Sequence, residues 1–361
     1  MVGEDYLWAT QLGRLMSVER STLLLSADDV AACLDMGEAI AAVREAFVAY
    51  HAKRAVMPPK SYINLPEHGG DVRSMPAKVG TDALSVKWIC SHPKNPERHG
   101  LPTVIGSLIL SDPATGWPLA VMDATLLTAY RTGAAAAVAS DTLARRDATT
   151  LGIIGAGTQA AYQIAAISHV RKLTRVTIAD ARIESTQRLV EALTKRAPHL
   201  DVRAGTLEEA AGEDIVCTLT PVHTPIVKRD WIGHGVHINA LGADAAGKQE
   251  LEVDILRDAV IVVDDWEQAT HSGEINVAMA AADLRPEHVR GTLGAILDGA
   301  LPGRSDDEEI TIFDSTGLAI QDTAVAKAVY ARAVRDGLGT PVDLVNTARV
   351  PFDAVLTQMR T

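Results

Sequence analysis

Residues 151–160 constrain the fold of this chain more than any other stretch. The apolar run from Leu151 to Ile154 predicts a short buried strand, and it leads directly into Gly155-x-Gly157-x-x-Ala160. An apolar helical pattern comes next. In such an arrangement Gly155 permits a tight strand-to-helix turn, Gly157 lets backbone N–H groups approach a pyrophosphate, and Ala160 keeps the helix close to the sheet. The pattern predicts a strand–turn–helix unit that binds a dinucleotide.

The residues after this unit favour NAD as the dinucleotide. A second predicted strand ends at Asp180, about twenty residues past the glycines, where a carboxylate binds both ribose hydroxyls and repels a 2′-phosphate. Arg182 could weaken that preference. Thr158 and Gln159, at the start of the helix, are further expected cofactor contacts. The alternative is a strand–turn–helix unit that binds nothing, with Asp180 capping the next helix. The order of strand, glycines, helix, second strand and acidic residue favours the cofactor.

Composition limits the class of protein. A net charge of −12 over 361 residues argues against a nucleic-acid partner, because phosphate binding requires a basic surface. The three cysteines show no paired spacing, which predicts free thiols in a reducing compartment. The first 25 residues show no signal-peptide pattern, and no apolar run reaches membrane-span length. We therefore expect a cytoplasmic protein that does not contact a membrane.

The pattern of elements predicts an α/β protein in three segments. Residues 1–145 are strand-rich and contain a hairpin with strands at 61–65 and 72–75, followed by a long helix with small residues at 133–137. Residues 146–312 alternate strands and helices, as expected for a Rossmann domain with a parallel sheet. Residues 313–361, after a strand at 310–313, are expected to return to the first domain. The Rossmann domain is thus inserted in a sheet-rich α+β domain.

One candidate acid lies beyond the predicted strand 236–240. Ligands in open α/β sheets bind beyond the carboxyl ends of the strands, so Asp244 is expected near the reacting end of the cofactor. A carboxylate there could activate water or move protons to and from a substrate amine. Alternatively, Asp244 and Lys248 form only a salt bridge within the loop, and spacing alone does not decide between the two.

Four cations in the first segment are candidates for binding an anion. If the hairpin pairs Asn64 with Arg73, then Lys60 and Arg73 share one face of the sheet. Lys87 takes the same side on the next strand, and Arg131 lies in an otherwise apolar helix. Such a set suits a substrate carboxylate, although each cation alone is as easily a solvated surface charge. The histidines show no spacing typical of a metal site, and no metal is expected.

Taken together, these segments resemble the ornithine cyclodeaminase/μ-crystallin family. The resemblance runs in order from about residue 22 to residue 345. The matching segments are 58–62, 71–77, 86–88 with His92-Pro93, 101–103, 131–133, 152–160, 242–251 and 313–317.

The resemblance implies a role for each candidate residue. It implies a homodimer in which the first domains of two subunits associate, and a small amino or imino acid as substrate. Asp244 becomes the catalytic acid and base, together with Lys87. The expected substrate-binding residues are Lys60, Arg73, Arg131 and Thr103. The remaining expected cofactor contacts are Thr132, Thr220, Lys248 and Ser315.

Members of the family differ in the step that comes after hydride transfer from the α-carbon. A dehydrogenase adds water to the imine, a ketimine reductase runs the reaction in the opposite sense on a cyclic imine, and a cyclodeaminase closes a ring and releases ammonia. The Arg73-Ser-Met-Pro segment resembles the alanine dehydrogenase or reductase branch. A strict ornithine cyclodeaminase is expected to carry a glutamate where this chain has Ser74. Cyclodeamination stays the alternative, and a non-catalytic, μ-crystallin-like binding protein is a second one.

Overall fold

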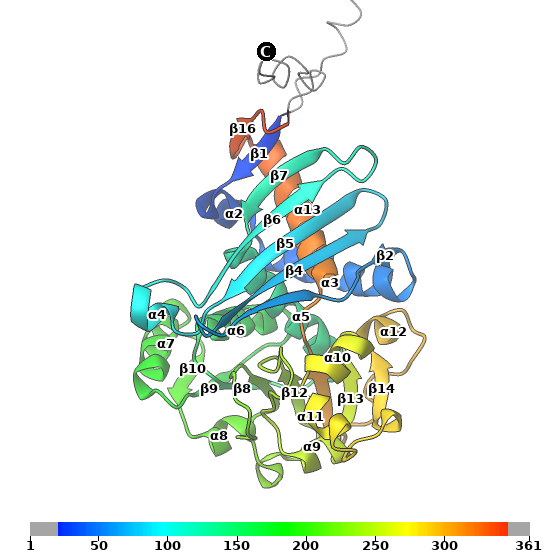
Figure 1. Cartoon of the computed structure of the whole chain (residues 1–361). Helices are drawn as coiled ribbons and strands as arrows, with labels where there is room; N and C mark the ends of the chain where they lie inside the picture. Colours follow the sequence, from blue (N-terminus) through cyan, green and yellow to red (C-terminus); the bar gives the residue numbers. More distant parts are fainter. Residues whose placement is uncertain (1–20, 346–361) are drawn as a thin grey trace, which may run out of the picture.

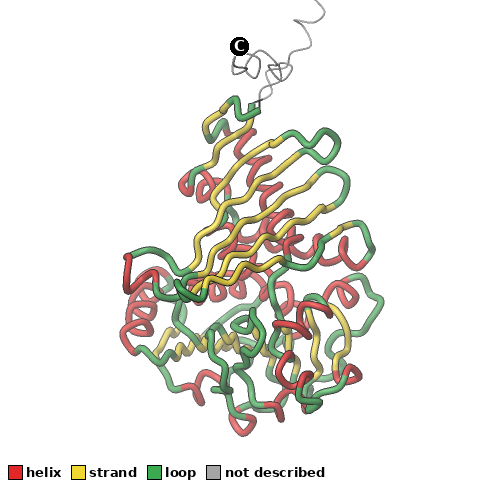
Figure 2. Tube along the Cα trace, in the orientation of Figure 1, coloured by secondary structure: helices red, strands yellow, loops and turns green. Residues whose placement is uncertain are grey.

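Two β-sheets of eight strands each organise residues 21–345, the part of the chain that the computed structural model describes (Figures 1 and 2). In the first sheet the strand order is β16-β1-β7-β6-β5-β4-β2, and β3 pairs with β4. Its strands are β1 (Thr22–Leu25), β2 (Ala55–Val56), β3 (Ser61–Leu65), β4 (Gly70–Val79), β5 (Ala83–Ser91), β6 (Val104–Ser111), β7 (Pro118–Asp123) and β16 (Thr340–Val342). All neighbours are antiparallel except β1 and β7.

The second sheet is parallel throughout, in the order β10-β9-β8-β11-β12-β15-β13-β14. Its strands are β8 (Thr150–Ile154), β9 (Arg175–Ala179), β10 (Asp201–Ala204), β11 (Ile215–Thr218), β12 (His237–Ala240), β13 (Val260–Val263), β14 (Val289–Thr292) and β15 (Thr311–Asp314). The strand order reverses beside β8, which is the Rossmann arrangement and the point where ligands bind. The fold class predicted from the sequence is confirmed.

Helices cover one face of the first sheet and flank the second (Figure 1). They are α2 (Ala27–Cys33), α3 (Met36–His51), α4 (Asn95–His99), α5 (Thr125–Leu143), α6 (Thr158–Val170), α7 (Ile183–Arg196), α8 (Leu207–Ala211), α9 (Val253–Asp258), α10 (Trp266–Ser272), α11 (Asn276–Ala280), α12 (Leu293–Leu297) and α13 (Ala319–Asp336), with 3₁₀ turns at Arg229–Trp231 and Pro286–His288.

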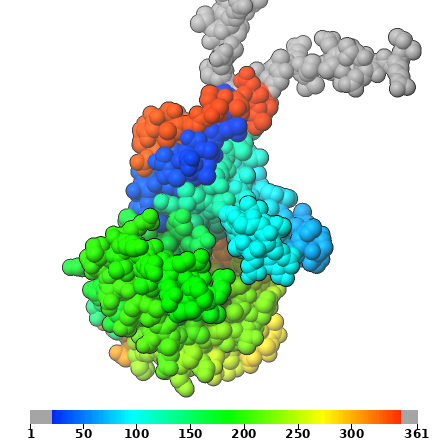
Figure 3. Space-filling model, turned by 90° about the vertical axis from the view of Figure 1, so that its left-hand side faces the viewer, coloured from blue at the N-terminus to red at the C-terminus, as the bar shows by residue number. Residues whose placement is uncertain are grey.

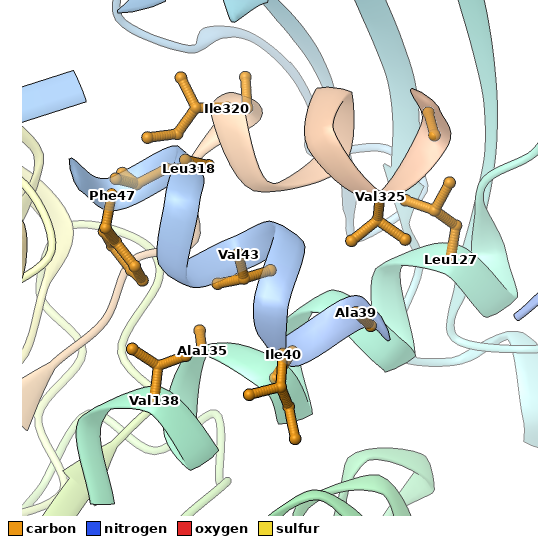
Figure 4. Packing of buried hydrophobic residues seen from close by; sticks show 14 of the residues in the cluster. Ala39, Ile40, Val43, Phe47, Leu127, Ala135, Val138, Leu318, Ile320 and Val325 are labelled. Atoms are coloured by element: carbon orange, nitrogen blue, oxygen red, sulfur yellow. The ribbon is translucent and has the colours of Figure 1, made fainter. Parts of the chain in front are cut away.

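The largest apolar core lies where α3, α5 and α13 meet (Figure 4). Val43 and Phe47 of α3 are fully buried between the other two helices. Asp35 caps α3 by accepting a hydrogen bond from the Glu38 amide (2.9 Å). The small residues of α5 serve close packing, because a Cβ on Gly133 would lie 2.7 Å from the Tyr162 carbonyl of α6. This core joins the two sheets through shared helices.

The structure corrects three details of the sequence prediction. Strand 310–313 does not return to the first domain: β15 lies between β12 and β13 in the second sheet, so a boundary at residue 312 cuts a central strand. The edge strands β10 and β14 are not predicted, because they are short and poorly apolar. The hairpin pairs Tyr62, not Asn64, with Arg73. This register differs by two residues, so the predicted face of Arg73 is unchanged.

Replacing Gly152 by alanine should destabilise the fold. A Cβ there would lie 1.8 Å from the backbone oxygen of Ala210 in α8, so strand or helix must move. We expect a loss of about 3 kcal/mol in the free energy of unfolding, measured by urea denaturation. Gly233→Ala is the control, because no atom lies within 4 Å of a Cβ there. Equal stability of the two variants would contradict the packing argument.

Candidate active site

The carboxyl ends of the second sheet's strands carry several residues of the candidate site. Because parallel strands end at one edge of the sheet, residues far apart in sequence meet there. They are Gly155 after β8, Asp180 after β9, Thr220 after β11, Asp244 after β12, Asp264 after β13 and Ser315 after β15. This edge faces the first sheet. Figure 3 shows the surface hollowed where the cyan residues of the first sheet meet the green residues of the second.

A cavity of about 440 Å³ lies at this edge, beside the glycine turn. Its lining includes Gly155, Asp180, Arg182 and Thr220. Gly155 has φ +107°, a conformation that side chains disfavour. A Cβ on Gly157 would meet nothing within 4 Å, so the space in front of this backbone is open to a phosphate. The N-terminal end of α6 begins directly after it.

Asp180 has a structural task as well as a place in this cavity. Its carboxylate accepts hydrogen bonds from the Ala156 amide and from the Arg182 amide, both at 2.7 Å. The first bond ties the glycine turn to β9. The second is a local bond to the residue ahead of α7, and the N-terminus of α7 has no side-chain cap, so the capping interpretation is wrong. Arg182 is exposed, with its Nε 3.9 Å from Asp180 Oδ1.

A second cavity, of about 170 Å³, lies between the two sheets. The four predicted cations converge on it. Its lining contains Lys60, Arg73, Lys87 and Arg131 together with Asp244, Thr132, Gln159 and Ser315. The interpretation that each cation is a solvated surface charge is wrong for this set, since Arg73, Lys87 and Arg131 are at most 9% exposed.

Asp244 forms ion pairs with two cations at the wall of this cavity. Its carboxylate lies 2.7 Å from Arg73 Nη1 and 2.5 Å from Lys248 Nζ. Burial alone would raise its pKa, but Arg73 and Lys248 hold the pKa of Asp244 well below its ordinary value. Arg73 is itself fixed by Asp71, at 2.6 Å, and lies over the Tyr62 ring. The loop salt bridge therefore exists, and Asp244, but not Lys248, lines the cavity.

Buried polar groups fix the loop that carries Asp244. The Glu250 carboxylate accepts hydrogen bonds from the Thr220 amide and hydroxyl and from the Gly242 amide, at 2.6–2.9 Å. The Glu274 carboxylate accepts from the Glu250 amide at 2.8 Å. Burial raises the pKa of both carboxyl groups. Asn276 accepts a hydrogen bond from the Gly247 amide and donates one to the Lys248 carbonyl, so the loop is held at both ends.

Lys60 is held by the loop after β15. Its Nζ donates to the Thr316 carbonyl (2.6 Å), and burial lowers its pKa to about 8. Asp264 orders this loop: its carboxylate accepts from the Gly317 amide at 2.8 Å and from the hydroxyl groups of Ser315 and Thr316 at 3.3 Å. Burial raises the pKa of Asp264 to about 6.

Five predicted contacts line neither cavity: Thr103, Gly157, Thr158, Ala160 and Lys248. Thr103 is exposed, and its carbonyl accepts a hydrogen bond from the His92 amide. Thr158 is exposed at the start of α6. Ser74 pairs with Trp88, and its side chain lies on the opposite face of the sheet from Arg73. A glutamate at this position would therefore not reach the distal amine of a diamino acid bound beside Arg73, so Ser74 does not distinguish the branches of the family. Within residues 21–345, no group of three or more potential ligands is arranged to hold a metal ion.

Several carboxylates of the site are not predicted from the sequence. Asp71 precedes Arg73 by two residues on one strand, a spacing that could have indicated their pairing. Asp322 resembles an ordinary polar residue of an amphipathic helix, and nothing local shows that it is buried. Asp264 and Glu250 act on backbone amides of distant loops, which only the tertiary structure brings close.

Known proteins share this architecture and these motifs. A model of the ornithine cyclodeaminase/mu-crystallin family matches residues 20–337. The chain belongs to this family. It is 47% identical to an alanine dehydrogenase of Archaeoglobus fulgidus over 321 residues, which are 89% of this chain and 98% of that one.

Two solved structures of the family have nearly the same fold. An archaeal alanine dehydrogenase dimer with bound NAD superimposes with a TM-score of 0.87 at 46% identity, over 90% of this chain and 100% of that chain. The Thermococcus litoralis Δ1-pyrroline-2-carboxylate reductase, in complex with NADH and L-proline, superimposes with a TM-score of 0.86 at 35% identity. The match covers 89% of this chain and 100% of that chain. The likeness extends over both sheets.

Replacing Gly157 by valine should remove cofactor binding without unfolding the protein. A Cβ there meets no protein atom within 4 Å, and the side chain takes up the space that a pyrophosphate needs. We expect NADH affinity, measured by fluorescence titration, to fall by roughly tenfold or more, which corresponds to about 1.4 kcal/mol. The thermal unfolding midpoint should stay near the wild-type value. Undiminished NADH affinity in the folded variant would place the cofactor elsewhere.

Proposed function

We propose that the chain is an NAD-dependent oxidoreductase that acts at the α-carbon of a small amino or imino acid with a neutral side chain. The observation that carries this proposal is the charge of the substrate cavity: four cations line it, and Asp244 is its one acidic residue among those described. The relatives support the same chemistry, since an alanine dehydrogenase and a pyrroline carboxylate reductase are among them. Alanine, or a cyclic imine of similar size, is the expected substrate.

The cavity can hold such a substrate in one orientation. Arg73, Lys87 and Arg131 offer donors to the α-carboxylate. Met75 and Ile89 lie on the same face of the sheet as Arg73 and Lys87 and provide an apolar wall for a small side chain. The α-carbon then faces the edge of the second sheet, where the glycine turn would hold NAD.

Asp244 is proposed to move the protons of the reaction. Bound NAD supplies the hydride acceptor for the α-carbon. Asp244 accepts a proton from the water that adds to the resulting imine carbon, and the C–N bond then breaks to release ammonia and the oxo acid. In the ligand-free chain Arg73 stabilises the carboxylate. A substrate carboxylate that binds Arg73 competes with Asp244 for this cation, and the pKa of Asp244 then rises toward a range useful for a base.

Cyclodeamination of a diamino acid is the alternative. Its substrate carries a distal ammonium, and the only carboxylate lining the described cavity already forms ion pairs with Arg73 and Lys248. This charge pattern favours the dehydrogenase. An assay of L-alanine, L-ornithine and L-lysine with NAD separates the two: ammonia and NADH rise together in a dehydrogenase, and ammonia rises without NADH in a cyclodeaminase. NADH binding with no turnover of any amino or imino acid would indicate a binding protein.

We also propose that the bare face of the first sheet associates with a second copy of the chain. α13, α3 and α5 cover only the other face (Figure 1). Ile105 and Ile109 of β6, Trp88 of β5 and Ile63 of β3 are 39–53% exposed on the bare face. An apolar surface of this extent is typical of a subunit interface, and the archaeal alanine dehydrogenase is a dimer.

The environment of the chain is also a proposal. The described cysteines Cys33, Cys90 and Cys217 are free, which suits a reducing compartment such as the cytoplasm. In residues 21–345, no helix combines the length and apolar character needed to cross a bilayer.

The Asp244→Asn variant tests the proposed chemistry. The amide keeps the shape but cannot accept a proton, so we expect kcat for L-alanine oxidation to fall by roughly a hundredfold or more. NADH affinity should change little, because Asp244 does not line the cavity beside the glycine turn that would hold the pyrophosphate. Asp82→Asn is the matched control, since Asp82 is exposed and pairs only with Lys327. Turnover at the wild-type rate would remove Asp244 from the mechanism.

The Ile109→Glu variant tests the proposed dimer. A charge in the middle of the bare face should split the dimer, because burying an unpaired carboxylate is costly. The mass measured by light scattering should fall from that of two chains to that of one. Val334→Glu, on exposed α13 surface, is the control and should leave the mass unchanged. A wild-type chain that is monomeric would contradict the interface.

A further inference from the structure

A single buried carboxylate contacts two of the cations that line the substrate cavity. Asp322, in the first turn of α13, is fully buried. Its Oδ1 accepts hydrogen bonds from Lys87 Nζ at 2.8 Å and from Arg131 Nε at 3.0 Å. The second oxygen, Oδ2, is buried and has no hydrogen-bond partner. The side chain of the preceding residue, Gln321, accepts a hydrogen bond from Arg131 Nη1 at 3.2 Å.

These contacts leave the group one positive charge in excess. Two buried cations share one carboxylate, and an uncompensated charge in the protein interior is costly. A second carboxylate entering the cavity supplies the missing partner. The charged groups that face Lys87 are Asp322 from α13, Arg131 from α5 and Lys60 from the segment before β3, and the Thr128 hydroxyl lies 3.3 Å away.

We propose that Asp322 is a positioning residue that holds Lys87 and Arg131 together as one binding unit for the substrate's α-carboxylate. It acts through the two cations and does not itself line the cavity. By pairing with Lys87 it also favours the protonated form of that side chain. The inference rests on the proposed function, because it assigns the carboxylate of that substrate to this pair.

The protonation of Lys87 distinguishes this role from a purely structural one. Burial lowers the pKa of Lys87 to about 7, and Asp322 opposes that shift. Removing the negative charge of Asp322 therefore lowers the pKa further. A carboxylate that needs the protonated lysine then loses affinity at a lower pH than in the wild type. A residue that only joins α13 to the sheet would weaken binding equally at every pH.

The experiment is a calorimetric titration of the NADH-bound chain with pyruvate, without ammonium, and with pyrrole-2-carboxylate. No imine forms from pyruvate under these conditions, so binding is measured apart from turnover. In Asp322→Asn we expect roughly ten- to a hundredfold weaker binding at about pH 8.5. The difference should narrow toward about pH 6, and the midpoint of the pH dependence should move down by about one unit or more. Asp322→Glu, which keeps the charge, should keep the wild-type midpoint.

Matched variants make each outcome decisive. Asp336→Asn removes an exposed carboxylate from the same helix and should bind both probes like the wild type. If Asp322→Asn does not fold, as judged by thermal unfolding, Lys87→Gln serves instead and should make the affinity independent of pH. Unchanged affinity in Asp322→Asn, an equal loss at every pH, or a pH dependence that persists in Lys87→Gln overturns the inference. Wild-type binding of these carboxylates without turnover of any amino or imino acid contradicts the proposed function alone, whereas no binding contradicts both.

Discussion

The pairing of buried cations with carboxylates from other elements holds this site together. A cation such as Lys87 loses its hydration inside the protein, and it stays charged only if a partner replaces the water. Two of the partners come from distant parts of the chain: Asp244 from the loop after β12 pairs with Arg73, and Asp322 from α13 pairs with Lys87. Asp71, the other partner of Arg73, lies on the same strand. The Arg73–Asp244 pair forms only when the two sheets are assembled against each other, so this part of the site and the junction of the sheets form as one unit.

The path of the chain makes this junction rigid. β15 lies in the middle of the second sheet, and α13, which comes directly after it, packs on the first sheet. The residues between them, 315–317, form one wall of the substrate cavity and are held by Asp264 from the end of β13. Gly317, at φ +78°, leaves space that the Arg131 guanidinium uses, since a Cβ there would lie 2.6 Å from Nη1. The connection between the sheets is thus also part of the site.

Local signals in the sequence predict the elements and the chemistry better than the partners. The glycines, Asp180 and the apolar strands follow from short-range patterns, and the common side of Arg73 and Lys87 follows from strand alternation even with a register two residues out. The sequence pattern places β15 in the wrong sheet because a buried parallel strand carries no mark of its neighbours. Asp322 is not predicted for a similar reason. Its position in the helical pattern is that of an ordinary polar residue, and only the packing of α13 shows that it is buried. A single sequence does not display long-range pairing.

Under the proposed function, the contact between Arg73 and Asp244 links substrate binding to catalysis. In the ligand-free chain the ion pair keeps Asp244 a stable carboxylate and therefore a weak base. A substrate carboxylate presents the same chemistry to Arg73 that Asp244 does, so the two compete for one guanidinium. Binding of the substrate thus weakens the interaction that lowers the basicity of Asp244. Lys248 remains beside the carboxylate and keeps it in place. A ligand without a carboxylate cannot produce this change, so the ion pair favours amino and imino acids over other small molecules that fit the cavity.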